Sequence, residues 1–178
     1  RAAPGTAGRP PRGTVVKLLD EEGDEVAPGE TGRIFVGNEM AFEGYTGGGG
    51  KQSVGGLLSS GDVGHFDAEG RLFIDGRDDE MIVSGGENVF PREVEELLIT
   101  LDGVADVAVL GAEDADFGQR LRAFLVLDAG ATVTEDQVKD FVKDNLARYK
   151  VPRDVLFLDE LPRNPTGKIL KRELALLE

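Results

Sequence analysis

The spacing of apolar residues changes near residue 76, and this change constrains the fold more than any other feature. Before it, short β-branched runs at residues 14–20 and 32–37 predict strands. Residues 71–75 alternate in the manner of a strand directly after the turn sequence DAEG at 67–70, which predicts a hairpin. The first 75 residues are therefore expected to be mainly β.

The rest of the chain alternates between helical and strand patterns. Pro91 suits a first helical turn, and apolar residues follow it at helical spacing: Val94, Leu97, Leu98 and Leu101. Thr134 and Gln137 form a capping box ahead of a second apolar helix face. A last helix is predicted over residues 169–177. Strands are predicted at 104–110, 121–127 and 155–158.

Together these patterns predict an α+β fold in two parts, a mainly β part over residues 1–77 and a small α+β domain over residues 78–178. Residues 46–56 hold six glycines, which are costly to order and predict a mobile surface loop. A phosphate-gripping loop is the alternative, but Lys51 is followed by Gln rather than Ser or Thr.

Charge and composition exclude several classes of function. The 178 residues carry a formal net charge of -14, which disfavours binding to nucleic acid or anionic lipid. Residues 143–178 are locally basic, with eight Lys or Arg against six Asp or Glu, so they could hold a small polyanion or be solvated surface. The absence of Cys excludes disulfides, thiolate zinc sites and cysteine nucleophiles.

Targeting signals are missing from the printed sequence. No apolar run is long enough to span a bilayer and no signal peptide is recognisable, so a cytoplasmic location is expected. The sequence begins with Arg in a Pro- and Gly-rich segment, and we therefore expect it to be a fragment.

Two segments around the change of pattern carry candidate binding residues. In Ser59-Ser60-Gly61-Asp62, the carboxylate can accept hydrogen bonds from vicinal sugar hydroxyls, or it can cap a local turn. Further along, Arg77 offers a five-donor fork suited to ribose or phosphate oxygens. The glycines after Ser84 permit close approach of the backbone to a ligand. The alternative is a solvated Arg followed by a tight β-turn.

A third segment, residues 161–169 (LPRNPTGKI), contains two prolines and presents Lys168 near the tip of a stiff loop. A lysine there can neutralise charge that develops on a phosphoryl or carboxylate oxygen. The segment is not a Walker loop, since Pro162 stands where that pattern needs Gly and Ile169 where it needs Ser or Thr. The alternative is an exposed lysine beside a helix cap.

The three segments occur together and in order, and the chain resembles the adenylate-forming (AMP-binding) superfamily of acyl-CoA synthetases, luciferases and adenylation domains. The motifs that carry the resemblance are SGD, GRxDxM, SGGENVFPREVE, RYKVP and LPRNPTGKILKREL. SGGENVFPREVE is most similar to the fatty acyl-CoA synthetase branch. The resemblance implies a carboxy-terminal fragment: the end of the large domain's β subdomain, then a small lid domain.

The resemblance also implies roles for individual residues. Asp62 and Arg77 would bind the ribose hydroxyls of ATP, and Asp79 would be the hinge between the large and small domains. Lys168 would contact the carboxylate and the α-phosphate during adenylation.

A second set of residues would serve the other half of the reaction. Ser84, Gly85 and Gly86 would line the channel for the pantetheine arm of CoA. No metal site made of protein ligands is implied, and Mg²⁺ would arrive with ATP.

The implied reaction joins a fatty or other carboxylic acid to CoA at the expense of ATP, through an acyl-adenylate, with rotation of the small domain between the two steps. The family's phosphate loop would lie before residue 1, so the fragment alone is expected to be inactive. Lys168 is also a candidate target of a lysine acetyltransferase. Two alternatives remain: an adenylating enzyme that transfers the acyl group to a carrier protein, and a non-catalytic binding module.

Overall fold

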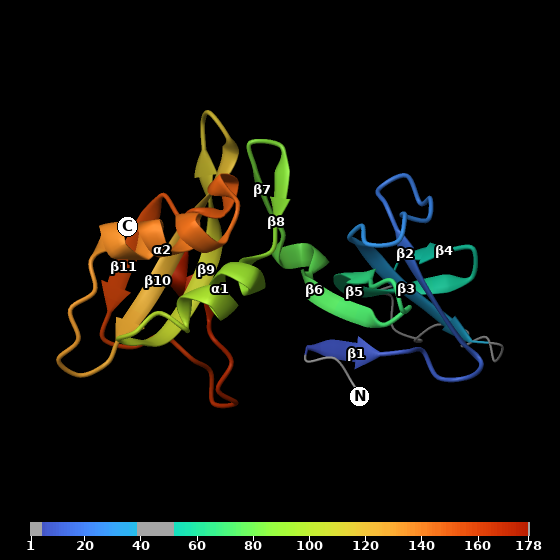
Figure 1. Cartoon of the computed structure of the whole chain (residues 1–178), viewed down its shortest axis with the longest axis horizontal. Helices are drawn as coiled ribbons and strands as arrows, with labels where there is room; N and C mark the ends of the chain where they lie inside the picture. The colour runs from blue at the N-terminus through green and yellow to red at the C-terminus, as the bar shows by residue number, and fades with distance from the viewer. Residues whose placement is uncertain (1–4, 39–51, 178) are drawn as a thin grey trace. The chain divides into compact units, whose positions relative to one another are not determined.

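The computed structural model describes residues 5–38 and 52–177, and the chain divides into two compact units, Arg1–Asp79 and Glu80–Glu178 (Figure 1). Each unit has a sheet of its own. Strands predominate over short helices, which confirms the predicted α+β fold. The glycine run at 47–50 lies outside the described residues. Among the helices that the structure describes, none is long and apolar enough to cross a bilayer.

Within the described residues, the first unit contains one six-stranded sheet in the order β1-β6-β5-β3-β2, with β4 paired to β5. All of its pairings are antiparallel. The strands are β1 (Thr6–Gly8), β2 (Thr14–Leu19), β3 (Gly32–Asn38), β4 (Ser53–Val54), β5 (Leu57–Phe66) and β6 (Leu72–Arg77). The apolar core of this unit contains Leu18, Leu19, Ile34, Phe35 and Val63.

The hairpin that the sequence predicts joins β5 to β6. The amide of Asp67 donates to the carbonyl of Arg71 at 3.0 Å, and the amide of Gly70 donates back to the carbonyl of Asp67 at 2.9 Å. Burial acts to raise the pKa of the Asp67 carboxyl, but hydrogen bonds from Arg71 outweigh it and lower this pKa below its ordinary value. The turn therefore fixes the register of the two strands that carry the first candidate site.

In the second unit, the described residues form a five-stranded sheet in the order β11-β10-β7-β8, with β9 paired to β10. β10 and β11 are parallel, and the other pairs are antiparallel. The strands are β7 (Ile82–Ser84), β8 (Glu87–Val89), β9 (Val104–Asp114), β10 (Gly118–Leu127) and β11 (Asp154–Leu158). The helices of this unit are α1 (Pro91–Leu98), α2 (Glu135–Asn145) and α3 (Lys171–Leu174), with the 3-10 turn η2 (Arg148–Lys150). Another 3-10 turn, η1 (Asp78–Glu80), begins in the first unit and ends at the first residue of the second.

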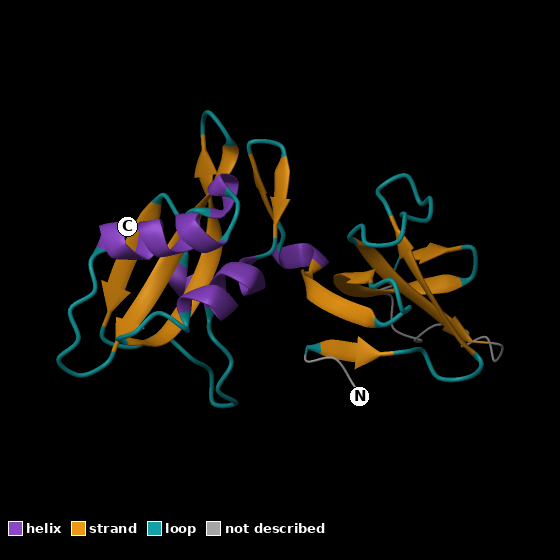
Figure 2. Ribbon diagram, in the orientation of Figure 1, coloured by secondary structure: helices purple, strands orange, loops and turns teal. Residues whose placement is uncertain are grey.

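Helices α1 and α2 pack on the sheet of the second unit (Figure 2). α1 begins at Pro91, as the sequence predicts. α2 begins after Thr134, whose hydroxyl accepts from the amide of Gln137 while the Gln137 side chain accepts from the amide of Thr134. This confirms the predicted capping box. The core between helices and sheet includes Val94, Leu98, Val109, Leu121, Leu125, Val138 and Val142.

A second apolar core consists of Ala108, Phe124, Leu161 and Leu174, and the C-terminal segment supplies the last two of these residues. The sequence predicts a helix over residues 169–177, but this bound is wrong, because α3 spans only Lys171–Leu174. Ile169 instead forms a β-bridge with Arg163, so the loop takes residues that the periodicity assigned to the helix. α3 is held by the buried Leu174 and by a 2.7 Å ion pair from Lys171 to Glu80.

Candidate functional site

The first candidate site lies on neighbouring strands of the first unit. Asp62 on β5 pairs directly with Arg77 at the end of β6. The Arg77 Nη1 lies 3.3 Å from Asp62 Oδ1, and its Nε lies 3.1 Å from Asp79 Oδ1. The hydrogen bond to Asp79 raises the pKa of Arg77, and the negative charge of Asp62 adds to this shift. The structure thus brings together Asp62, Arg77 and Asp79, three residues to which the family resemblance assigns roles.

A glycine is required beside this pair. Gly61 has a φ of +83°, a conformation that side chains rarely adopt, and a Cβ added there would lie 3.3 Å from Arg77 Nη2. The hydroxyl of Ser59 accepts from the amide of Gly61, and that of Ser60 accepts from the amide of Asp62, both at 3.1 Å. The SGD segment is therefore a locally hydrogen-bonded irregularity inside β5. It presents a carboxylate beside a half-exposed guanidinium, an arrangement suited to a vicinal diol.

The second candidate site is the turn between β7 and β8 in the second unit. Gly85 and Gly86 both have positive φ, +62° and +86°, as a two-residue hairpin turn needs. The amide of Gly85 donates to the carbonyl of Phe117 at 2.9 Å, and a Cβ on Gly85 would lie 3.0 Å from the Phe117 ring. A Cβ on Gly86 would meet nothing within 4 Å. Ser84 precedes this turn as the last residue of β7.

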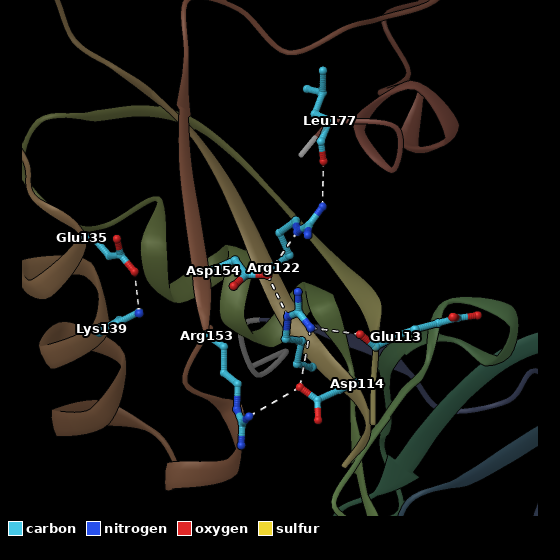
Figure 3. A network of polar contacts seen from close by, with 9 residues as sticks. Glu113, Asp114, Arg122, Glu135, Lys139, Arg153, Asp154 and Leu177 are labelled. Carbon is cyan, nitrogen blue, oxygen red and sulfur yellow. Dashed lines mark hydrogen bonds and ion pairs between the residues drawn. The ribbon is translucent and has the colours of Figure 1, made fainter. Parts of the chain in front are cut away.

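Figure 3 shows a polar network that includes Asp114, Arg153 and Asp154. The guanidinium of Arg153 lies 4.0 Å from the centre of the Phe117 ring and 3.4 Å from the Asp114 carboxylate. Burial acts to raise the pKa of Asp114, but hydrogen bonds from the amides of Asp116 and Phe117 outweigh it, so the pKa is lowered. Neither Phe117 nor Arg153 was identified from the sequence, because their contact depends on the β9–β10 hairpin.

The same network continues along β10. Arg120 and Arg122 both donate to Asp154 Oδ2, at 2.8 and 3.2 Å, and Arg122 also donates to the carbonyl of Leu177 at 2.7 Å. Burial acts to raise the pKa of Asp154, but the hydrogen bonds from the two arginines outweigh it and lower this pKa. These contacts join β10, β11 and the chain after α3.

The third candidate site is the loop that carries Lys168. Its ends meet in the bridge between Arg163 and Ile169, and Lys168 is exposed. The β7–β8 turn and this loop, the dark red segment before α3, lie at opposite ends of the second unit (Figure 1). The structure therefore does not bring Lys168 and the Gly85–Gly86 turn together. Across the described residues, no cluster of three or more His, Cys, Asp or Glu could hold a metal ion.

Comparison with known proteins identifies clear relatives. Residues 93–168 match the AMP-binding enzyme C-terminal domain. An indoleacetate–CoA ligase from Aromatoleum aromaticum is 38% identical over 175 residues, which cover 96% of this chain and 34% of the relative. A long-chain-fatty-acid–CoA ligase from Mycobacterium tuberculosis is 46% identical over 119 residues, 67% of this chain and 24% of the relative.

Solved structures also match the chain along nearly its whole length. The crystal structure of ATP-bound MatB from Rhodopseudomonas palustris superimposes with a TM-score of 0.86 at 36% identity, covering 97% of this chain and 35% of that one. Nearly all of this chain takes part in the matches to the indoleacetate–CoA ligase and to MatB, but it spans only about a third of the length of those proteins.

Proposed function

Because the chain belongs to the adenylate-forming family of AMP-binding enzymes, we propose that it forms the ribose-binding strands and the lid of an AMP-forming acyl-CoA ligase. The observation that carries this proposal is the pairing of Asp62 with Arg77 next to Asp79. A carboxylate and a guanidinium side by side can hold the two ribose hydroxyls of ATP, one accepting and the other donating.

In the first half of the proposed reaction, a carboxylate oxygen of the acid attacks the α-phosphorus of ATP, and pyrophosphate leaves. Negative charge gathers on the phosphoryl oxygens, and the ammonium of Lys168 stabilises it there. The exposed position of Lys168 at the end of its loop suits such a role. Mg²⁺ would accompany the triphosphate, because it is typically held by substrate phosphates together with one or two carboxylates.

In the second half, the CoA thiolate attacks the acyl carbonyl and AMP leaves. The Ser84–Gly85–Gly86 turn suits a narrow ligand such as a pantetheine arm, because Gly86 leaves its surroundings open. Lys168 and this turn lie at opposite ends of the second unit, which supports a rotation that exchanges one for the other. We place the hinge at Asp79, with the large domain's β part over residues 1–77 and the lid over residues 78–178.

A fatty acid is the proposed acyl donor, supported by the similarity to a long-chain-fatty-acid–CoA ligase. The relative named for indoleacetate shows that the matching segment also occurs in a ligase for a different acid. Transfer of the acyl group to a carrier protein is the second candidate.

The intact parent protein, incubated with ATP and a series of acids, should release AMP in a CoA-dependent manner. Thioester that forms only on a phosphopantetheinyl carrier would instead support the second candidate.

The role of Lys168 is tested by separating the two half-reactions in the parent protein. Lys168→Ala should lower acyl-adenylate formation by about 10²- to 10³-fold, as for the loss of a charge-stabilising donor. Thioester formation from supplied acyl-adenylate should be largely unchanged. Lys139→Ala is the matched control, since Lys139 lies on α2 in an ion pair with Glu135. Equal loss of both half-reactions in Lys168→Ala would contradict the proposal.

A further inference from the structure

Asn164 forms hydrogen bonds with both backbone polar groups of Lys168, its amide and its carbonyl. The amide of Lys168 donates to Asn164 Oδ1 at 2.9 Å, and the carbonyl of Lys168 accepts from the amide of Asn164 at 2.9 Å. The same Oδ1 accepts from the amide of Thr166 at 3.0 Å and from its hydroxyl at 2.7 Å. One side-chain oxygen therefore fixes the path of the four residues that end at Lys168.

Arg163 ties this loop to the sheet. Its Nη1 donates to the carbonyl of Gly167 at 2.7 Å, and its Nη2 donates to Asp106 Oδ2 on β9 at 2.5 Å. Asp106 is itself oriented, since its Oδ1 accepts from the amide of Val107 at 3.0 Å. Gly167, the residue just before Lys168, is thus tied through one guanidinium to β9 of the second unit.

Hydrogen bonds, more than packing, hold the tip of the loop. Pro165, Thr166, Gly167 and Lys168 are exposed, and Gly167 has a φ of +86° that an ordinary side chain would not tolerate. A flexible loop would leave the ammonium spread over many positions. A displacement of about 1 Å can cost a reaction about 10²-fold in rate, so the order of this backbone matters for a lysine that must meet a reacting phosphoryl group.

We propose that Asn164 and Arg163 are positioning residues for Lys168, Asn164 through its Oδ1 and Arg163 through its bridge from Gly167 to Asp106. This inference rests on the function proposed above, in which Lys168 acts during adenylation. Neither residue touches substrate, and both act through the conformation of the loop.

The loop itself is tested first, without any enzymatic assay. Hydrogen exchange of the Thr166 and Lys168 amides, measured by NMR on the 178-residue chain, should accelerate about tenfold in Asn164→Ala, as expected for the loss of one hydrogen bond. Asn164→Asp retains the accepting oxygen and should keep the protection. Asn145→Ala is the matched control, because the Asn145 side chain also bonds to the backbone, although through its Nδ2, which donates to the carbonyl of Phe141 on α2. Unchanged exchange in Asn164→Ala would overturn the proposal.

The consequence for catalysis is tested in the parent protein. Asn164→Ala should lower the kcat of adenylation by about 10- to 100-fold, with little change in the KM for ATP. Thioester formation from supplied acyl-adenylate should stay within about twofold of wild type, and Asn164→Asp should restore most of the adenylation rate. Asn145→Ala should leave both half-reactions unchanged.

The failure of this inference differs from the failure of the proposed function. If Lys168→Ala abolishes adenylation while Asn164→Ala leaves it intact, the positioning role is wrong and the function stands. If Lys168→Ala itself has no effect on adenylation, the proposed function fails. Equal loss of both half-reactions in Asn164→Ala would indicate general damage and would also overturn the positioning role.

A double-mutant cycle tests the arm formed by Arg163. Arg163→Gln and Asp106→Asn should each lower adenylation several-fold, and the double variant should be no worse than Arg163→Gln alone, because the two residues act through one contact. Strictly additive effects would remove Arg163 from the proposal.

Discussion

At the scale of single residues, Gly61 decides where the guanidinium of Arg77 can lie. Replacing Gly61 with Ala places a methyl group 3.3 to 3.5 Å from three atoms of that guanidinium and adds strain at a φ of +83°. On the function proposed above, we expect Gly61→Ala to raise the KM for ATP in the parent protein by about tenfold, equivalent to about 1.4 kcal/mol of binding. Initial rates of adenylation at varied ATP measure this effect.

The control for this prediction is Gly56→Ala. Gly56 has the same φ of +83°, but a methyl group there would meet nothing within 4 Å. Both variants should lose about 1 kcal/mol of stability through backbone strain. Only Gly61→Ala should raise the KM for ATP. A similar rise in KM for both variants would show that strain alone, rather than displacement of Arg77, is responsible.

The sequence identified Asp62 and Arg77 but not their contact. They are 15 positions apart, and they meet because the β5–β6 register shifts between Val63 and Gly64. A Cβ at Gly64 would lie 2.1 Å from the carbonyl oxygen of Phe73, so this close approach of two backbones requires glycine. A single glycine in a strand pattern signals a bulge, but it does not say which residues the bulge will bring face to face.

At the scale of elements, the capping box of α2 should contribute to the stability of the second unit. Thr134→Ala removes the hydroxyl that accepts from the amide of Gln137, and we expect a loss of about 1 kcal/mol in the free energy of unfolding. Urea denaturation followed by circular dichroism measures it. Thr132→Ala, at an exposed position just before the helix, is the matched control and should change stability by less than about 0.5 kcal/mol. Equal losses in the two variants would mean that the cap contributes nothing specific.

The helix starts show which parts of the fold can be predicted from a few neighbouring residues. Thr134, Gln137 and Pro91 mark the starts of α2 and α1, because caps and first-turn prolines act within a few residues. The end of the chain does not follow its own periodicity, since the bridge between Arg163 and Ile169 delays α3 until Lys171. Tertiary hydrogen bonds, such as that from Arg163 to Asp106, are invisible to a pattern of apolar residues.

The candidate site divides in the same way. Lys168 and the Gly85–Gly86 turn stand out in the sequence because residue type alone limits what they can do. Asn164 and Phe117 do not stand out, since their importance depends on contacts across the fold: Asn164 with Lys168, and Phe117 with Gly85. Residues that position other residues are thus the part of a site that is hardest to predict from one sequence.

At the scale of the whole molecule, aspartates that are paired in the fold make its stability depend on pH. Asp67 in the first unit and Asp114 and Asp154 in the second have pKa values below the ordinary 3.8. A carboxyl whose pKa is lower in the folded state stabilises the fold above its unfolded pKa, and this contribution is lost as the pH falls through the folded pKa. Burial raises the pKa of Glu95, so its effect has the opposite sign, and acidification relieves a penalty there.

Asp154→Asn tests this linkage, because it removes the carboxylate that accepts from Arg120 and Arg122 while keeping the shape of the side chain. Near pH 7 we expect the variant to be about 1 kcal/mol less stable than wild type. As the pH falls below 3.8, wild type loses the contribution of Asp154 and the two stability curves should converge. Asp159→Asn changes the net charge by the same amount at an exposed position, and its curve should run parallel to that of wild type. Urea denaturation at a series of pH values from 7 to about 2.5 distinguishes these outcomes, and parallel curves for Asp154→Asn would show that the two arginines do not lower the pKa of Asp154 in solution.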